Sequence, residues 1–350
     1  MTKRTFFIVV AISFLSVLFN YIYFTHPTTT DRNNFIPDTI SLEAQETLKN
    51  LFKLKIYTLS APHSEDGTAW REMNILYEKA MRPKNIKIAA KNQVSIEQTT
   101  IGNIPVLDIR PKNWKDNHKL IIYIHGGAYT LLSPETTLLI SAPISRVTGQ
   151  RILAIRYTTA PFADWQKIQS EVITVVKSLL AQGYRMQDIV MLGDSAGGGL
   201  AMSTVIQLRD HNLGMPAALV LLSPWSDLTT RGESMQTLAN ADPILDYDNM
   251  LMNSALAYAH GLKLNDPRIS PLYADFRNGF PPTLIIEGTR CIFLSSSVRL
   301  YQALDGAQQE VLLDMHEGMW HGFLDAPTPE AETAIKKIAM FIQNHQLSVS

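Results

Sequence analysis

Residues 189–199 read IVMLGDSAGGG, and this stretch decides how the rest of the chain is interpreted. Four apolar residues typical of a buried strand run directly into a G-x-S-x-G motif centred on Ser195, and a helical pattern follows over residues 196–209. A strand, a sharp turn and a helix form the context in which this motif presents a nucleophilic serine. Gly193 and Gly197 supply the small residues that so tight a turn requires. We therefore predict that Ser195 is a nucleophile beside a helix N-terminus, which favours developing negative charge.

Short apolar strands alternate with helices on both sides of this turn. Strands are predicted at residues 120–124, 152–155, 189–192, 218–222, 283–286 and 310–313, with helices between them, such as 169–180. This alternation predicts an α/β fold in which helices cover both faces of a mostly parallel sheet. Residues 94–110 alternate well enough to form two further strands around a turn at Gly102 and Asn103.

Two segments fall outside this alternation and are candidate parts of a helical cap. Residues 41–90 contain two predicted helices, at 41–55 and 68–81. Residues 227–267, approximately, contain a helical run near 249–258. We expect both segments to belong to a single folded domain over residues 41–350.

The N-terminus predicts a membrane segment. Lys3 and Arg4 precede an uncharged, apolar run from Phe6 to Phe24, close to the roughly 20 residues that cross a bilayer as a helix. The run ends in aromatic residues instead of a small-residue cleavage site. We expect residues 1–26 to be a signal anchor with the remaining chain on the non-cytoplasmic side, and residues 27–40 to be a tether. A cleaved signal peptide, which would give a secreted protein, is the alternative.

The bulk composition excludes several classes of site. The 350 residues are 46% hydrophobic and 18% charged, with a net charge of −1. A chain so nearly neutral has no overall field that would attract nucleic acid. Its single cysteine, Cys291, rules out an internal disulfide and a cysteine-rich metal site.

A glycine turn and a histidine complete the predicted chemistry. Residues 125–129 read HGGAY directly after the strand at 120–124, which is the type of turn that offers backbone N–H groups to a tetrahedral intermediate. The expected donors are Gly126, Gly127 and Ala196, whereas His125 is expected to hold the loop.

The general base is expected after the last strand, and His321 in EGMWHGF (317–323) fits this position. His316 is the competitor, but it lies at or just past the strand end, before the turn at Gly318. The other candidates, at positions 211, 260 and 345, have the character of surface or helix residues.

Five motifs occur in one order along the chain: HGGAY, GDSAGG, SPWSDL, SPLYADFRNGFPP and GMWHGF. Together they resemble the hormone-sensitive-lipase-like branch of the α/β-hydrolases over about residues 120–342. The resemblance implies a capped α/β-hydrolase that cleaves carboxylic esters, often with short or medium acyl chains, without metal or cofactor. It assigns nucleophile and base to Ser195 and His321, and the oxyanion hole to the glycine turn.

The sequence departs from this family at the catalytic acid. The family places Asp or Glu in a G-[ST]-x-[DE] pattern, whereas residues 288–291 read GTRC, so Cys291 occupies that position. Loss of the acid costs roughly 10⁴ in kcat in a well-studied serine protease. Asp227 and Glu287 are possible substitutes, although we expect Glu287 to point away from the site. A smaller departure is YTTAPF at 157–162, where the family reads YRLAPE.

Two functions are therefore open. The first is a membrane-anchored serine carboxylesterase that works by an acyl-enzyme and is weak unless another carboxylate substitutes. The second is a catalytically impaired binding protein that keeps the hydrolase fold and its pocket. Ser195, His321 and the glycine turn favour the first function, and Cys291 favours the second.

Overall fold

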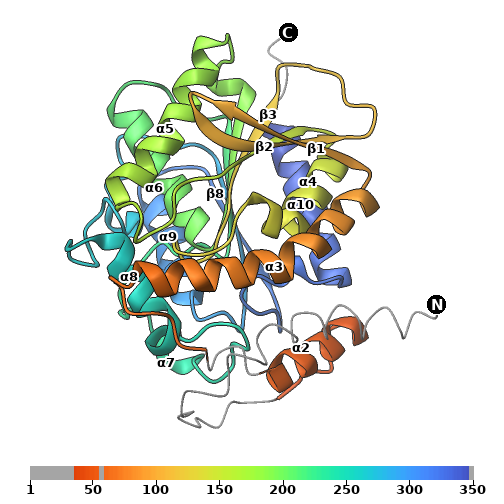
Figure 1. Cartoon of the computed structure of the whole chain (residues 1–350), viewed down its shortest axis with the longest axis vertical. Coiled ribbons are helices and arrows are strands. Elements are labelled where there is room, and N and C mark those ends of the chain that lie inside the picture. The colour runs from red at the N-terminus through yellow and green to blue at the C-terminus, as the bar shows by residue number, and fades with distance from the viewer. Residues whose placement is uncertain (1–34, 55–58, 347–350) are drawn as a thin grey trace.

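The computed structural model describes residues 35–54 and 59–346, which are built around an eight-stranded sheet (Figure 1). The strand order is β1-β2-β4-β3-β5-β6-β7-β8. The pairs β1–β2 and β2–β4 are antiparallel, and all the other pairs are parallel. The strands are β1 (Val94–Ile101), β2 (Ile104–Pro111), β3 (Leu120–Ile124), β4 (Arg151–Ile155), β5 (Ile189–Asp194), β6 (Ala218–Leu222), β7 (Thr283–Gly288) and β8 (Val311–His316). The predicted, mostly parallel sheet is confirmed.

Helices cover both faces of the sheet, as the alternating pattern predicts. In Figure 1, α5, α6 and α9 lie on one side of the sheet, and α4 and α10 lie on the other. The helices are α2 (Leu42–Leu54), α3 (Gly67–Lys91), α4 (Leu138–Thr148), α5 (Trp165–Ala181), α6 (Ala196–Asp210), α7 (Ser234–Thr237), α8 (Met252–Ala259), α9 (Leu294–Gly306) and α10 (Pro329–His345).

The central strands are buried on both faces, which explains why they read as continuous apolar runs. In β3, Leu120, Ile122 and Ile124 face the core under α5, α6 and α9, whereas Ile121 and Tyr123 face the core under α4 and α10. Side chains alternate between the faces of a strand, so each strand contributes to two hydrophobic cores. Burial of this kind contributes about 25 cal/mol for each Å² of apolar surface removed from water. The rigid sheet that results fixes the ends of its strands relative to one another.

One helix extends well beyond its prediction. We expect a helix over residues 68–81, but α3 begins at Gly67 and continues to Lys91 with Pro83 inside it. The Asp66 side chain accepts a hydrogen bond from the Ala69 N–H and caps the helix. Proline in a helix interior removes a hydrogen bond, so the sequence favours an earlier end. Packing of α3 against α4 outweighs that cost, and Asn85 accepts a hydrogen bond from the Leu139 N–H across the contact.

The two candidate cap segments meet over the loop that follows β3. The Ala61 N–H donates to the Asn249 carbonyl at 2.7 Å and joins the two segments. From α3, Asn74 donates to the Thr130 carbonyl at 2.7 Å, and from α8, the ring of Tyr258 stacks on Tyr129 with centroids 3.7 Å apart. Both segments therefore contact the loop that follows β3, and Figure 1 shows α8 at one end of α3.

The N-terminal predictions fall outside what the structure describes. The expected signal anchor, residues 1–26, and most of the expected tether, residues 27–40, precede the described part of the chain. Within residues 35–54 and 59–346, no helix combines the length and apolar character needed to cross a membrane.

Candidate active site

Ser195 lies at the sharp turn between β5 and α6, where the sequence predicts it. Its backbone has φ +53° and ψ −123°, a conformation that costs a non-glycine residue energy and is maintained only by its surroundings. Here the Ser195 N–H donates to the Leu222 carbonyl at 2.8 Å, and the Trp225 N–H donates to the Ser195 carbonyl at 2.8 Å. The neighbouring strand β6 and the loop after it therefore hold the serine in its strained conformation.

Close backbone approach explains the glycines that flank the serine. A Cβ on Gly197 would lie 2.0 Å from the Ile124 carbonyl oxygen, and a Cβ on Gly193 would lie 2.3 Å from the Gly197 carbonyl oxygen. Neither position can accept a side chain without movement of the backbone. The G-x-S-x-G spacing is thus a packing requirement at the carboxyl ends of β3 and β5.

The structure brings His321 to Ser195. His321 lies between β8 and α10, and its Nε2 is 3.0 Å from Ser195 Oγ. The competitor His316 ends β8 and instead bonds through its Nε2 to Asp314 at 2.9 Å. His321 is therefore the histidine positioned to receive a proton from the serine hydroxyl.

The other nitrogen of His321 meets a thiol where the family has a carboxylate. His321 Nδ1 lies 3.4 Å from Cys291 Sγ, and the Phe293 N–H also approaches that sulfur at 3.4 Å. Burial raises the pKa of the Cys291 thiol well above its usual value, so the thiol is neutral at neutral pH. In the described part of the chain, no carboxylate hydrogen-bonds to His321. Burial lowers the pKa of His321 to about 3, so its imidazolium form is poorly stabilised.

Asp227 does not replace the missing acid. Its carboxylate accepts hydrogen bonds from Thr229 Oγ1 at 2.7 Å, from the Tyr273 hydroxyl at 2.9 Å and from Arg299 at 2.7 Å. These contacts fix the loop after β6, and none of them involves His321. Asp227 thus has a structural role in the part of the chain that reads SPWSDL.

Glu287 lies closer to the site than we expected. Its carboxylate accepts hydrogen bonds from the Gly288 N–H at 2.9 Å and from Ser297 Oγ at 2.7 Å, and it interacts with the Cys291 side chain. The expectation that Glu287 points away from the site is wrong, because side-chain alternation along β7 places residues 285 and 287 on the α9 face. Cys291 begins the turn into α9 on that same face.

The glycine turn lies against the serine, and Asp194 holds it there. A Cβ on Gly126 would lie 3.0 Å from Ser195 Cβ. The Gly126 N–H donates to Asp194 Oδ1 at 2.9 Å, and the Tyr123 hydroxyl donates to the same oxygen at 2.6 Å. The N–H of Gly126 is therefore already engaged, whereas within residues 35–54 and 59–346 neither Gly127 nor Ala196 has its N–H bonded to a protein acceptor.

Asp194 and Tyr123 are functional residues that sequence reasoning missed. Asp194 fills the variable position before the serine, and Tyr123 is one of five apolar strand residues in β3. Burial raises the pKa of Asp194 to about 6, while its two hydrogen-bond donors lower it. The one available signal was a carboxylate inside a motif that does not require one.

His125 supports the turn, in line with its predicted role. Its Nδ1–H donates to the Gly126 carbonyl at 2.7 Å, and its ring stacks on Tyr157 with centroids 4.3 Å apart. The Tyr157 hydroxyl donates to the His125 carbonyl at 2.9 Å. Burial lowers the pKa of His125 to about 4, so the ring is neutral and structural.

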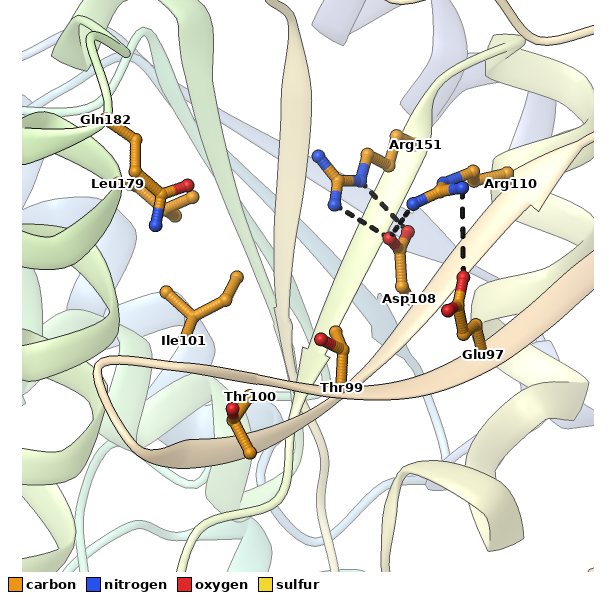
Figure 2. Close-up of a pocket in the computed structure, with 9 residues that line it drawn as sticks. All are labelled: Glu97, Thr99, Thr100, Ile101, Asp108, Arg110, Arg151, Leu179 and Gln182. Carbon is orange, nitrogen blue, oxygen red and sulfur yellow. Dashed lines mark hydrogen bonds and ion pairs between the residues drawn. The ribbon is translucent and has the colours of Figure 1, made fainter.

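A separate cavity of about 190 Å³ lies at the β1–β2 edge of the sheet (Figure 2), and Ser195 is not among the residues that line it. Asp108 pairs there with both Arg110 and Arg151, and Glu97 pairs with Arg110, so two cations face two anions. Charges balanced in this way leave no net attraction for a charged ligand. Over residues 35–54 and 59–346, the structure contains no group of three or more His, Cys, Asp or Glu side chains that could hold a metal ion.

Comparison with families and characterised sequences gives a consistent result. Residues 121–325 match the model of a family described as having the alpha/beta hydrolase fold. An esterase of Acinetobacter venetianus is 32% identical over 225 residues, which cover 64% of this chain and 74% of the esterase. An acetyl-hydrolase of Streptomyces hygroscopicus is 30% identical over 247 residues, which cover 70% of this chain and 81% of that protein.

Solved structures agree with the sequence matches. Esterase E25 superposes with a TM-score of 0.82 at 27% identity, covering 93% of this chain and 99% of its own. An esterase from the bacterial hormone-sensitive lipase family superposes with a TM-score of 0.77 at 27% identity, covering 88% of this chain and 99% of its own. The similarity therefore extends over nearly the whole described domain.

Proposed function

Because this chain belongs to the α/β-hydrolase family, in its hormone-sensitive-lipase-like branch, we propose that it cleaves carboxylic esters through an acyl-enzyme formed on Ser195. The observation that carries the proposal is the 3.0 Å contact between Ser195 Oγ and His321 Nε2. This distance lies within the reach required of a nucleophile and its general base.

The proposed reaction has two halves. Ser195 Oγ forms a bond to the ester carbonyl carbon while its proton passes to His321 Nε2. The intermediate collapses by breaking the bond to the alcohol, which leaves with that proton and gives the acyl-enzyme. Water then repeats the sequence with the same base and releases the carboxylic acid and free Ser195.

The oxyanion of each intermediate is proposed to lie beside the glycine turn. The free N–H groups of Gly127 and Ala196 are the primary donors, and Ala196 adds the N-terminus of α6. The Gly126 N–H contributes less to the oxyanion hole, because it already donates a hydrogen bond to Asp194. One such donor is typically worth 10²- to 10³-fold in kcat.

Short acyl chains are the proposed substrate class. The named activity of the Streptomyces relative, an acetyl-hydrolase, supports this class, and so do the acetyl esterases that match this chain. Both candidate cap segments contact the loop that follows β3, and the acyl pocket is proposed to lie beneath α3 and α8.

The direct test combines covalent labelling with turnover. Ser195 should react with a fluorophosphonate probe, and the protein should hydrolyse p-nitrophenyl acetate and butyrate. Ser195→Ala provides the matched control, because a methyl group replaces the hydroxymethyl group in the same turn. Absence of labelling together with turnover no faster than this control would overturn the proposal.

Cys291 favours a second candidate, a hydrolase-fold binding protein with impaired turnover. A neutral thiol donates and accepts hydrogen bonds only weakly and offers no charge to the imidazolium. Under this alternative, an ester protects the protein against thermal unfolding but is consumed no faster by the wild type than by Ser195→Ala. Turnover that depends on Ser195 excludes the alternative.

Membrane attachment through residues 1–26 is a further proposal, supported by their length and apolar character. The full chain should remain in the membrane fraction after extraction at alkaline pH, and removal of these residues should release it. Full-length protein found in the soluble fraction would contradict the anchor.

A further inference from the structure

Glu287 is buried, and among the residues that the structure describes no cation pairs with its carboxyl group. It is 0% exposed, and its hydrogen-bond donors are neutral groups, the Gly288 N–H and Ser297 Oγ. Burying a carboxyl group in such surroundings is costly, and burial raises the pKa of Glu287 to about 7. A carboxyl group buried at this cost, one residue before the end of β7, invites a functional explanation.

The neighbours of Glu287 connect it to the reacting atoms. Its carboxyl group interacts with the Cys291 side chain, Cys291 Sγ lies 3.4 Å from His321 Nδ1, and His321 Nε2 lies 3.0 Å from Ser195 Oγ. All four side chains belong to segments at the carboxyl end of the sheet. The contacts therefore run from the Glu287 carboxyl group through the Cys291 thiol and the His321 imidazole to Ser195. Compared with a serine triad, one thiol is inserted between the acid and the histidine.

A thiol can serve both of its neighbours at once. Its single S–H can be donated to the Glu287 carboxylate, while the sulfur accepts a hydrogen bond from the Nδ1–H of His321. This arrangement fixes the tautomer in which Nε2 is unprotonated and faces Ser195. In a serine triad, fixing the tautomer is one of the two tasks of the acid, and stabilising the imidazolium is the other.

We propose that Glu287 is a positioning residue that performs the task of the missing catalytic acid through the thiol of Cys291. The inference rests on the proposed role of Ser195 and extends it. No proton leaves the thiol: the Cys291 S–H stays on sulfur, and the serine proton moves only to His321 Nε2 and then to the leaving alcohol. Glu287 touches neither the substrate nor the serine.

A purely structural role is the competing explanation, since Glu287 also joins β7 to α9 through Ser297. The two explanations differ in what happens when a carboxylate is placed directly on His321. In Cys291→Asp, the new carboxylate contacts the histidine itself and lies beside Glu287. Two adjacent buried carboxylates cannot both ionise, so one of them takes up a proton.

Glu287→Gln should therefore lower kcat in the wild-type background but not in the Cys291→Asp background. In the wild type it removes the charge behind Cys291, and kcat should fall roughly 10- to 100-fold with KM unchanged, the range expected when a catalytic group is slightly misplaced. In Cys291→Asp it removes the competing carboxylate, so kcat should stay constant or rise. Loss of kcat by the same factor in both backgrounds would overturn the proposal in favour of a structural role.

Two controls complete the experiment. Asp108→Asn also converts a buried carboxylate to its amide, but on β2, where Asp108 pairs with Arg151 and makes no contact with Ser195. This variant should lower stability without lowering kcat per labelled active site. Glu287→Asp keeps the charge and should restore part of the activity lost in Glu287→Gln. If Glu287→Gln is as active as the wild type and its Ser195 is still labelled, the role of Glu287 is refuted and the serine mechanism stands. If the wild-type protein itself shows neither labelling nor turnover, the serine mechanism is refuted.

Discussion

Replacing Cys291 by aspartate should raise the esterase activity of this protein. The Cys291 sulfur is 0% exposed and lies 3.4 Å from His321 Nδ1, so a carboxylate at this position would meet the imidazole directly. The other ring nitrogen, Nε2, already lies 3.0 Å from Ser195 Oγ. The substitution changes only the group that faces Nδ1.

The size of the gain follows from the histidine. Burial lowers the pKa of His321 from 6.5 to about 3, so the imidazolium is disfavoured by roughly 10³-fold relative to an exposed histidine. A carboxylate in contact typically recovers about 10- to 10³-fold of such a loss. Glu287 lies beside the new carboxylate and competes with it for ionisation, which places the expected gain near the lower end of that range.

The measurement is kcat for p-nitrophenyl acetate, normalised to the fraction of Ser195 labelled by a fluorophosphonate. Cys291→Asn is the matched control, since it has the shape of aspartate without the charge, and it should be no faster than the wild type. The reasoning is refuted if Cys291→Asp is folded and labelled yet no faster than Cys291→Asn. That result would mean that the imidazolium is already stabilised by another group.

Three further predictions concern the supporting structure. Gly197→Ala should abolish activity and lower the free energy of unfolding by more than about 3 kcal/mol, because the new Cβ would lie 2.0 Å from a backbone oxygen. Gly306→Ala is the control: its Cβ would have no atom within 4 Å, so urea unfolding should be nearly unchanged. Tyr123→Phe removes a 2.6 Å hydrogen bond to Asp194 and should lower the free energy of unfolding by about 1–3 kcal/mol. It should also lower kcat, because Asp194 would hold the glycine turn less firmly. Unchanged stability and kcat would contradict that role. Burial in the folded state raises the pKa of Glu287 from 4.5 to about 7, so the folded protein binds this proton more tightly than the unfolded chain does. The free energy of unfolding should therefore fall as the pH rises between these two values. Glu287→Gln should flatten that part of the profile of urea midpoint against pH, and an unchanged profile would show that Glu287 does not titrate there.

Local chemistry made much of the site predictable. The strand, turn and helix around Ser195 can be identified because a tight turn at the end of a buried strand accepts only small flanking residues, a requirement visible within eleven consecutive letters. His321 was identifiable by its position after the last strand. The end of α3 was not, since packing against α4 carries the helix through Pro83 against the local preference.

The sequence by itself determined which groups are present: a serine in an elbow, a glycine turn, a late histidine and a cysteine in place of an acid. Only the tertiary structure decided which of them touch. The Gly126 N–H is bound to Asp194, Asp227 is held by Arg299, and Glu287 lies behind Cys291. These outcomes depend on the register of β7 beside β6 and on the packing of α9, in which residues far apart in the chain become neighbours. A pattern of neighbouring letters carries no information about such long-range contacts, and so the role of Cys291 could be interpreted only once its surroundings were known.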